Sequence, residues 1–158
     1  MTETFGIRYD MDLRSPEVNE AAPKDALGEQ AGHQYYHFPE YEHVFKKDQE
    51  DTLRRVFSAF AKQENYPIYV HCTYGRDRTG MVCYLLEGLL GVSEEDAYKD
   101  YCLSAFTDSY IPDDRFAIFK TALDELEGDS FKEKVEGYLL SIGVTPEEIN
   151  NIRTILLQ

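Results

Sequence analysis

The chain has 158 residues and a mass of 18.3 kDa, which suits one domain with a single sizeable core. Its formal net charge of −14 and its pI near 4.6 argue against nucleic acid and anionic membranes as partners. No apolar stretch reaches the length that spans a bilayer. The sequence therefore predicts a single domain over residues 1–158 with no membrane span and no nucleic-acid partner.

The cysteine content bears on compartment and on metal binding. Cys72, Cys83 and Cys102 have no metal-ligand spacing relative to the four histidines, so no metal is expected. An odd number of cysteines in a chain of this size favours reduced thiols and a cytoplasmic setting. The first residues do not resemble a signal peptide, although a signal already removed would leave no trace. We expect Cys83 to be a small core residue, with a resolving role towards an oxidised Cys72 as the alternative.

The first half of the chain alternates strand-like and loop-like segments before one helix. Residues 5–13 favour a strand, and residues 17–32 have the irregular, glycine- and proline-containing composition of a loop. Residues 34–38 favour a second strand. Apolar residues at helical spacing between about residues 44 and 64 predict a helix that packs on the sheet.

A short polar segment, residues 71–80, lies between an apolar strand-like run over residues 67–70 and an apolar helical run over residues 81–90. A loop at a helix start presents unpaired N–H groups and the positive end of the helix dipole, which together bind anions such as phosphate. Cys72 opens this loop. Nearby arginines and the helix start are expected to lower its thiol pKa, so that the thiolate is the resting form.

Other residues of this segment complete an anion site. Arg78, six positions after Cys72, is placed to face the sulfur and clamp two phosphate oxygens. Gly75 permits a turn that a β-carbon would obstruct, and Gly80 lets the helix start pack closely against the loop. Tyr74 is expected to line the pocket or to shield it. The remaining positions expected to bind substrate are Thr73, Arg76 and Thr79.

The second half predicts a series of helices with clear start signals. Ser93 is expected to cap a helix that runs to about residue 104. A further helix is predicted over residues 112–127 and another over residues 130–141. Thr145, followed by proline and then Glu148, predicts a capping box at the start of the last helix. These helices are interpreted as core packing without chemistry.

The order His-Cys-x5-Arg-Thr, with glycine three and eight positions after the cysteine, resembles the signature of the cysteine-dependent protein tyrosine phosphatase superfamily. The triplet Asp12-Leu13-Arg14 is similar to a strand end in one bacterial branch, which includes tyrosine, dual-specificity and lipid phosphatases and carries lysine where this chain has Arg76. An ion pair that ends the strand is the alternative role for Asp12 and Arg14. A structural cysteine followed by a solvated basic loop is the alternative for the signature itself.

The fold is expected to be α/β, with a small, mostly parallel sheet flanked by helices and a helical C-terminal cap, as the resemblance also implies. In the branch that this chain resembles, a segment with a further strand usually precedes the Asp-Leu-Arg strand. This chain begins almost on that strand. We therefore expect either a shortened relative or a fragment.

The resemblance implies phosphoester hydrolysis through a phosphocysteine intermediate, with no cofactor. Cys72 is the expected nucleophile, and Arg78 with the loop amides would hold the phosphoryl oxygens. Thr79 resembles the hydroxyl that assists the thiolate as leaving group in the second step. His71 is expected to stiffen the loop by hydrogen bonds from outside the pocket.

The general acid stays open at this point. Many relatives carry an aspartate on the loop before the helix, where this chain has Glu40 and Glu42 and no aspartate until Asp48. Asp77 matches an acidic position within the signature of myotubularin-like phosphatases and is favoured, with Asp12 second and Glu40 third. The alternative for Asp77 is a hydrogen bond that shapes the loop.

The substrate is also open. The acidic composition favours a phosphorylated protein, on tyrosine or with dual specificity, or a small phosphoester. A phosphoinositide or inositol phosphate would need extra cations, which Arg76 with His33 or His37 would supply. The rivals of other classes are a pseudophosphatase that binds phosphate without turnover and a rhodanese-like sulfurtransferase, whose loop is usually shorter. The sequence does not fix the oligomeric state.

Overall fold

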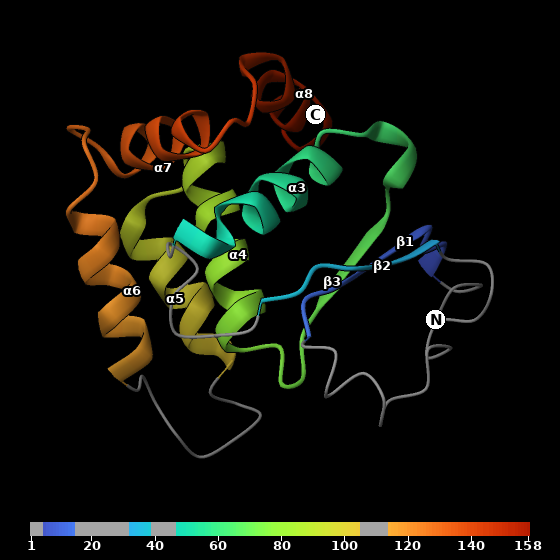
Figure 1. Cartoon of the computed structure of the whole chain (residues 1–158), viewed down its shortest axis with the longest axis horizontal. Helices are drawn as coiled ribbons and strands as arrows, with labels where there is room; N and C mark the ends of the chain where they lie inside the picture. The colour runs from blue at the N-terminus through green and yellow to red at the C-terminus, as the bar shows by residue number, and fades with distance from the viewer. Residues whose placement is uncertain (1–4, 15–31, 39–46, 105–113) are drawn as a thin grey trace.

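The computed structural model describes residues 5–14, 32–38, 47–104 and 114–158. Its sheet is parallel, as expected, and has the strand order β2-β1-β3 (Figure 1). The strands are β1 (Tyr9–Asp12), β2 (Gly32–Tyr35) and β3 (Ile68–His71). Because parallel strands bring their carboxyl ends to one edge, the residues that follow β1 and β3 meet there.

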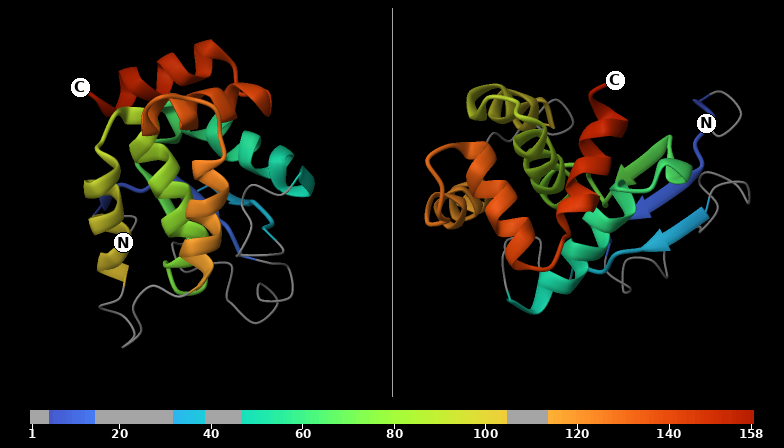
Figure 2. Two further views of the ribbon diagram at one scale, coloured as in Figure 1. Left: turned by 90° about the vertical axis from the view of Figure 1, so that its left-hand side faces the viewer. Right: turned by 90° about the horizontal axis from the view of Figure 1, so that it is seen from above.

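The other elements of the described residues are six α-helices and two short 3-10 helices. In chain order these are η1 (Lys47–Gln49), α3 (Glu50–Phe60), η2 (Gln63–Asn65), α4 (Asp77–Leu90), α5 (Glu94–Leu103), α6 (Asp114–Asp124), α7 (Phe131–Ser141) and α8 (Pro146–Leu156). Helix α4 follows β3 and contacts α5, α6, α7 and α8. Seen from above in Figure 2, α3 and α8 lie next to the sheet and α6 lies farthest from it. The α/β fold with a helical C-terminal cap is confirmed.

The sheet has one apolar and one polar face, because side chains alternate along a strand. Met11 and Leu13 are fully buried in a core that they share with Leu53 and Phe57 of α3 and with residues of α4. Asp10 and Asp12 alternate with these residues along β1, so their side chains point to the opposite face. The apolar face thus anchors the helices, and the polar face carries the charged groups described below.

The helix starts predicted from local signals are confirmed. Ser93 caps α5 and Ser130 caps α7, each side chain accepting a hydrogen bond from the backbone N–H three residues on. Thr145 and Glu148 form the predicted capping box of α8. The longest described helix, α4, has 14 residues, and among the described helices none is both long and apolar enough to cross a bilayer.

Three predicted elements that precede β3 have other bounds in the structure. The helix expected over residues 44–64 runs only from Glu50 to Phe60, because residues 47–49 form a 3-10 turn and Lys62 is extended; residues 44–46 lie outside the described chain. The strand expected over residues 5–13 starts at Tyr9, since Gly6 has a left-handed φ of 63° that interrupts an extended chain. The strand expected over 34–38 is Gly32–Tyr35, because pairing with β1 sets its length.

Candidate active site

The segment between β3 and α4 forms a tight turn on the amino end of the helix. Gly75 lies at its tip with a φ of +70°, a left-handed conformation that favours glycine. Arg76 is the N-cap residue, and its carbonyl accepts a hydrogen bond of 2.7 Å from the Gly80 N–H. The helix begins at Asp77, four residues before the predicted start of the helical run. Both Asp77 and Arg78 therefore lie in the first helical turn.

The Cys72 thiol is buried at the mouth of this turn. Burial alone would raise its pKa. The Thr79 hydroxyl and the backbone N–H groups of Thr79, Tyr74 and Gly75 act as donors near the sulfur and outweigh that effect, so the pKa of Cys72 lies below its usual value. These donors favour the thiolate.

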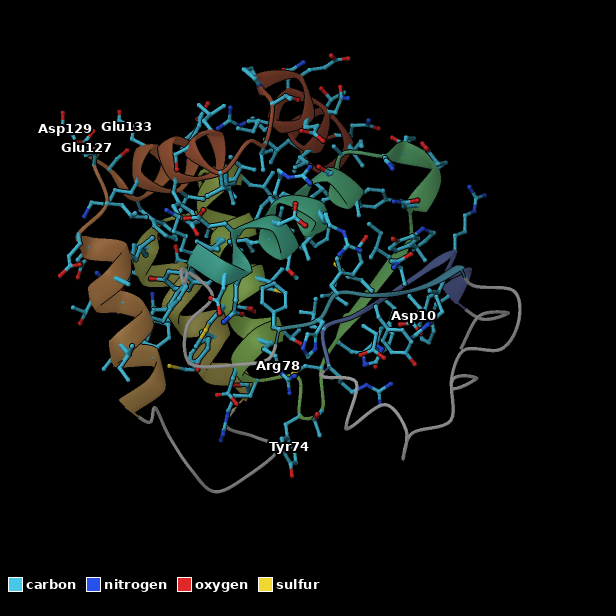
Figure 3. All side chains as sticks on the ribbon, viewed as in Figure 1. Asp10, Tyr74, Arg78, Glu127, Asp129 and Glu133 are labelled. Atoms are coloured by element: carbon cyan, nitrogen blue, oxygen red, sulfur yellow. The ribbon has the colours of Figure 1, made fainter. Side chains whose placement is uncertain are left out.

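The Arg78 guanidinium is buried between the loop and the end of β1. It donates to the Leu13 carbonyl at 3.2 Å and to Thr73 Oγ1 at 3.5 Å. Because Thr73 directly follows Cys72, these contacts hold the guanidinium on the side of the loop that carries the thiol. Figure 3 shows Arg78 at the base of α4, inside the molecule.

The remaining loop side chains differ in exposure. Tyr74 is 75 % exposed, and Figure 3 shows it pointing away from the body of the protein, so it does not shield the thiol. Asp77 is 7 % exposed, and its Oδ1 accepts a hydrogen bond of 3.3 Å from Arg76 Nε. The close approach that Gly80 permits is to the Tyr101 ring of α5: a β-carbon at Gly80 would lie 2.8 Å from two ring carbons. The expectation that Gly80 packs against the loop is corrected accordingly.

Asp12 and Arg14 form a fork-shaped ion pair at the end of β1. Arg14 Nε lies 2.9 Å from Asp12 Oδ1, and Arg14 Nη2 lies 2.6 Å from Oδ2. Asp12 is fully buried, and burial acts to raise its pKa, but the hydrogen bonds from Arg14 prevail and hold the pKa below its usual value. The Asp12 carboxyl is therefore an anion that holds Arg14, not a ready proton donor.

A cluster that the sequence analysis did not predict joins all three strands on the polar face. His71 Nε2 of β3 lies 2.9 Å from Asp10 Oδ1 of β1, and His33 Nε2 of β2 lies 3.2 Å from Asp12 Oδ2. His71 Nδ1 lies 3.3 Å from the Cys72 carbonyl oxygen. The alternation of Asp10 and Asp12 along β1 places both carboxylates on one face of the sheet. Which histidines they meet depends on the register of β1 with β2 and β3, which local sequence patterns do not predict.

The burial of His71 acts to lower its pKa. The close contact with the Asp10 carboxylate and the charges of Asp12 and Asp10 act in the other direction and prevail, so the pKa of His71 is raised. The sheet therefore carries a partly buried cation directly beside the first residue of the anion loop.

Cys83 differs from Cys72 in ionisation, and two other predicted residues lie outside the described chain. Cys83 is partly buried, and burial together with the charges of Glu87, Asp100 and Cys72 raises its pKa to about 12, so it is a neutral thiol. Glu40 and Glu42 lie outside the described residues. Within the described ranges no three His, Cys, Asp or Glu side chains are grouped so as to hold a metal ion.

Comparison with known proteins places these features in a family. A family model described as the tyrosine phosphatase family matches residues 1–158. A tyrosine-protein phosphatase of Nostoc commune is 29 % identical over 130 residues, an alignment that covers 67 % of this chain and 44 % of that protein. The chain thus spans less than half the length of this curated relative.

Proposed function

Because the chain belongs to the tyrosine phosphatase family, we propose that it hydrolyses phosphate monoesters through the thiolate of Cys72. The observation that carries this proposal is the turn at the amino end of α4, where the buried Cys72 thiol has its pKa lowered by three backbone N–H donors and the Thr79 hydroxyl. The same N–H groups would bind the oxygens of a phosphoryl group on the sulfur. Arg78, held beside Thr73, supplies the positive charge.

The proposed reaction has two displacements. In the first, Cys72 Sγ attacks phosphorus, the ester P–O bond breaks, and the leaving oxygen takes a proton from a carboxylic acid. In the second, water attacks phosphorus of the phosphocysteine and gives a proton to the carboxylate left by the first step, the S–P bond breaks, and inorganic phosphate leaves. The Thr79 hydroxyl stabilises the thiolate that is released in this step. Arg78 and the loop amides stabilise the equatorial oxygens in both steps.

We propose Asp77 as the general acid. It stands in the first turn of α4, beside the anion loop, and is 7 % exposed. Asp12, the second candidate, is held as an anion by Arg14, which disfavours proton donation. Glu40, the third candidate, falls outside the described residues.

The proposed substrate is a phosphorylated protein, on tyrosine or with dual specificity. Tyr74 at the rim of the loop supplies an exposed ring against which an aromatic leaving group can pack. A phosphoinositide, the alternative substrate, would need cations beside the loop. His33, one of the histidines considered for that purpose, contacts Asp12 on the sheet. The other alternative, a pseudophosphatase, would bind phosphate without turning it over.

We further propose that residues 1–158 act as one domain in a reducing, cytoplasmic setting. In support, a single apolar cluster includes residues of β1 and of α3 to α8. Cys72, Cys83 and Cys102 are all free thiols.

A substrate panel with two variants tests the function. Wild type is expected to hydrolyse p-nitrophenyl phosphate, a phosphotyrosine peptide and an alkyl phosphate, and Cys72→Ser to lose all three activities. Asp77→Asn should lower kcat on the alkyl phosphate by about 10²- to 10⁴-fold and change aryl turnover far less, because an acidic leaving group hardly needs protonation. Asp129→Asn, a charge change on an exposed turn far from the loop, is the matched control (Figure 3).

Each alternative function predicts a different result in this substrate panel. Turnover by wild type of p-nitrophenyl phosphate alone, whose acidic leaving group hardly needs a general acid, would favour a pseudophosphatase that binds physiological phosphoesters without hydrolysing them. Preferred hydrolysis of phosphoinositides over peptides would assign a lipid substrate. Thiosulfate-to-cyanide sulfur transfer through Cys72, without phosphoester hydrolysis, would replace the phosphatase by a sulfurtransferase.

A further inference from the structure

The polar face of the sheet carries two buried carboxylates next to the anion loop. Asp10 is 5 % exposed and Asp12 is 0 % exposed. Arg14 binds both oxygens of Asp12, and His33 approaches the same carboxylate at 3.2 Å. Of the described ion-pair partners of Asp10, His71 is the nearer, at 2.9 Å, while His33 is 3.8 Å away. Asp10 is therefore the carboxylate that depends on His71 for its countercharge.

Both ring nitrogens of His71 face oxygen acceptors. Nε2 lies 2.9 Å from Asp10 Oδ1, and Nδ1 lies 3.3 Å from the carbonyl oxygen of Cys72. The contact with Asp10 is an ion-pair contact, since Asp10 Oδ1 is buried and accepts no hydrogen bond from the described residues. A protonated ring at this distance compensates the charge of the buried carboxylate. The geometry at His71 thus favours the protonated ring.

The charge balance of the face agrees with that protonation state. Two buried carboxylates, from Asp10 and Asp12, need two positive charges, since an unpaired buried charge is costly. Arg14 supplies one of them and protonated His71 the other. Among the described residues, the other titratable side chains that contact His71 or its partners are His33 and Tyr35 of β2 and Tyr69 of β3, whose ring stacks on His71 at 4.9 Å.

We propose that Asp10 is a positioning residue, which holds His71 doubly protonated so that the imidazolium fixes the Cys72 carbonyl and stabilises the neighbouring thiolate. The effect on the sulfur has two parts. The hydrogen bond to the carbonyl fixes the first peptide of the loop, which orients the following N–H donors. The positive charge of the ring lowers the free energy of the nearby anion. The role of this thiolate as nucleophile rests on the proposed function; its stabilisation does not.

The wild-type protein alone provides a first test. Imidazole ¹⁵N NMR at about pH 7 is expected to show protons on both nitrogens of His71, with a titration midpoint above the ordinary value of about 6.5. A single neutral tautomer of His71 at this pH would overturn the proposal. This measurement requires no substitution and no turnover.

Variants then connect Asp10 to the sulfur. Asp10→Asn should lower the His71 titration midpoint by about one unit or more and raise the pH midpoint of Cys72 alkylation by iodoacetamide. Asp10→Glu, which keeps the charge, should restore part of both shifts, and Asp129→Asn should change neither. We expect kcat/KM of Asp10→Asn on a phosphotyrosine peptide at pH 6 to fall severalfold, with partial recovery at higher pH as the thiol ionises.

Unchanged midpoints in a folded Asp10→Asn protein would overturn the proposal even if hydrolysis were impaired. Shifted midpoints in a protein with no hydrolytic activity would instead support the positioning role and remove the proposed function. Should Asp10→Asn fail to fold, the wild-type NMR result decides alone.

Discussion

Cys72 and Cys83 differ in ionisation although they lie close in the sequence. Donors around Cys72 hold its pKa below the usual value, whereas burial and two nearby carboxylates raise the pKa of Cys83 to about 12. At pH 7 the thiolate fraction of Cys83 is then only about 10⁻⁵. We therefore predict that iodoacetamide alkylates Cys72 at least about 100-fold faster than Cys83 at this pH, as measured by mass spectrometry of the labelled peptides.

Two controls accompany this prediction. Vanadate, an analogue of the phosphoryl group, should protect Cys72 without changing the labelling of Cys83. In denaturant the two thiols should react at similar rates, since the difference comes from the folded environment. Comparable rates in the native protein would contradict the assignment of Cys72 as the resting thiolate.

At the scale of elements, the contact of α4 with α5 leaves no room for a side chain at Gly80. A β-carbon there would lie 2.8 Å from the Tyr101 ring, which is itself buried. Gly80→Ala is therefore predicted to lower the free energy of unfolding by about 1 to 3 kcal/mol, measured by urea denaturation. The same change should reduce activity, because Gly80 lies in the first turns of the helix that carries Arg78.

A double-mutant cycle separates this clash from helix propensity. Tyr101→Leu removes the ring, so the loss from Gly80→Ala should be smaller in that background. Gly137→Ala in α7, where a β-carbon would meet no atom closer than 3.9 Å, should be neutral or stabilising by up to about 1 kcal/mol. Additive losses for Gly80 and Tyr101 would show that the two residues do not clash.

The elements also show which features local sequence can predict. The caps at Ser93, Ser130 and Thr145 follow from three or four adjacent residues and are confirmed. The loop that follows β3 is predictable for the same reason, because its residues are contiguous. The contact between Gly80 and the Tyr101 ring cannot be predicted in this way. Tyr101 lies on another helix, so its distance from Gly80 depends on tertiary packing.

The cluster of Asp10, Asp12, His33 and His71 on the polar face cannot be predicted from local sequence. Asp10 meets His71 only because β1 lies between β2 and β3 in a register that pairs Asp12 with His71. A shift of one residue would turn the carboxylates towards the apolar helices. Because these residues are far apart in the chain, no contiguous sequence pattern predicts the cluster.

At the scale of the whole molecule, a local positive site lies within an acidic protein. The sequence has 30 acidic and 16 basic residues, so its net charge of −14 repels dianionic phosphoesters. Arg78 is buried, so its charge would act mainly on a group already bound in the loop. The long-range field and the local site thus act in opposite directions on an approaching phosphopeptide.

This opposition predicts a substrate preference that depends on salt. A phosphotyrosine peptide flanked by lysine and arginine should have a kcat/KM about 10-fold or more above that of a peptide flanked by aspartate and glutamate at low ionic strength. Stopped assays in increasing NaCl should show the difference shrink towards about 1 M, where the Debye length is about 3 Å. p-Nitrophenyl phosphate, which lacks flanking charges, is the reference for direct salt effects on catalysis. A preference that persists at high salt would mean that close contacts, not the net charge of −14, discriminate between the peptides.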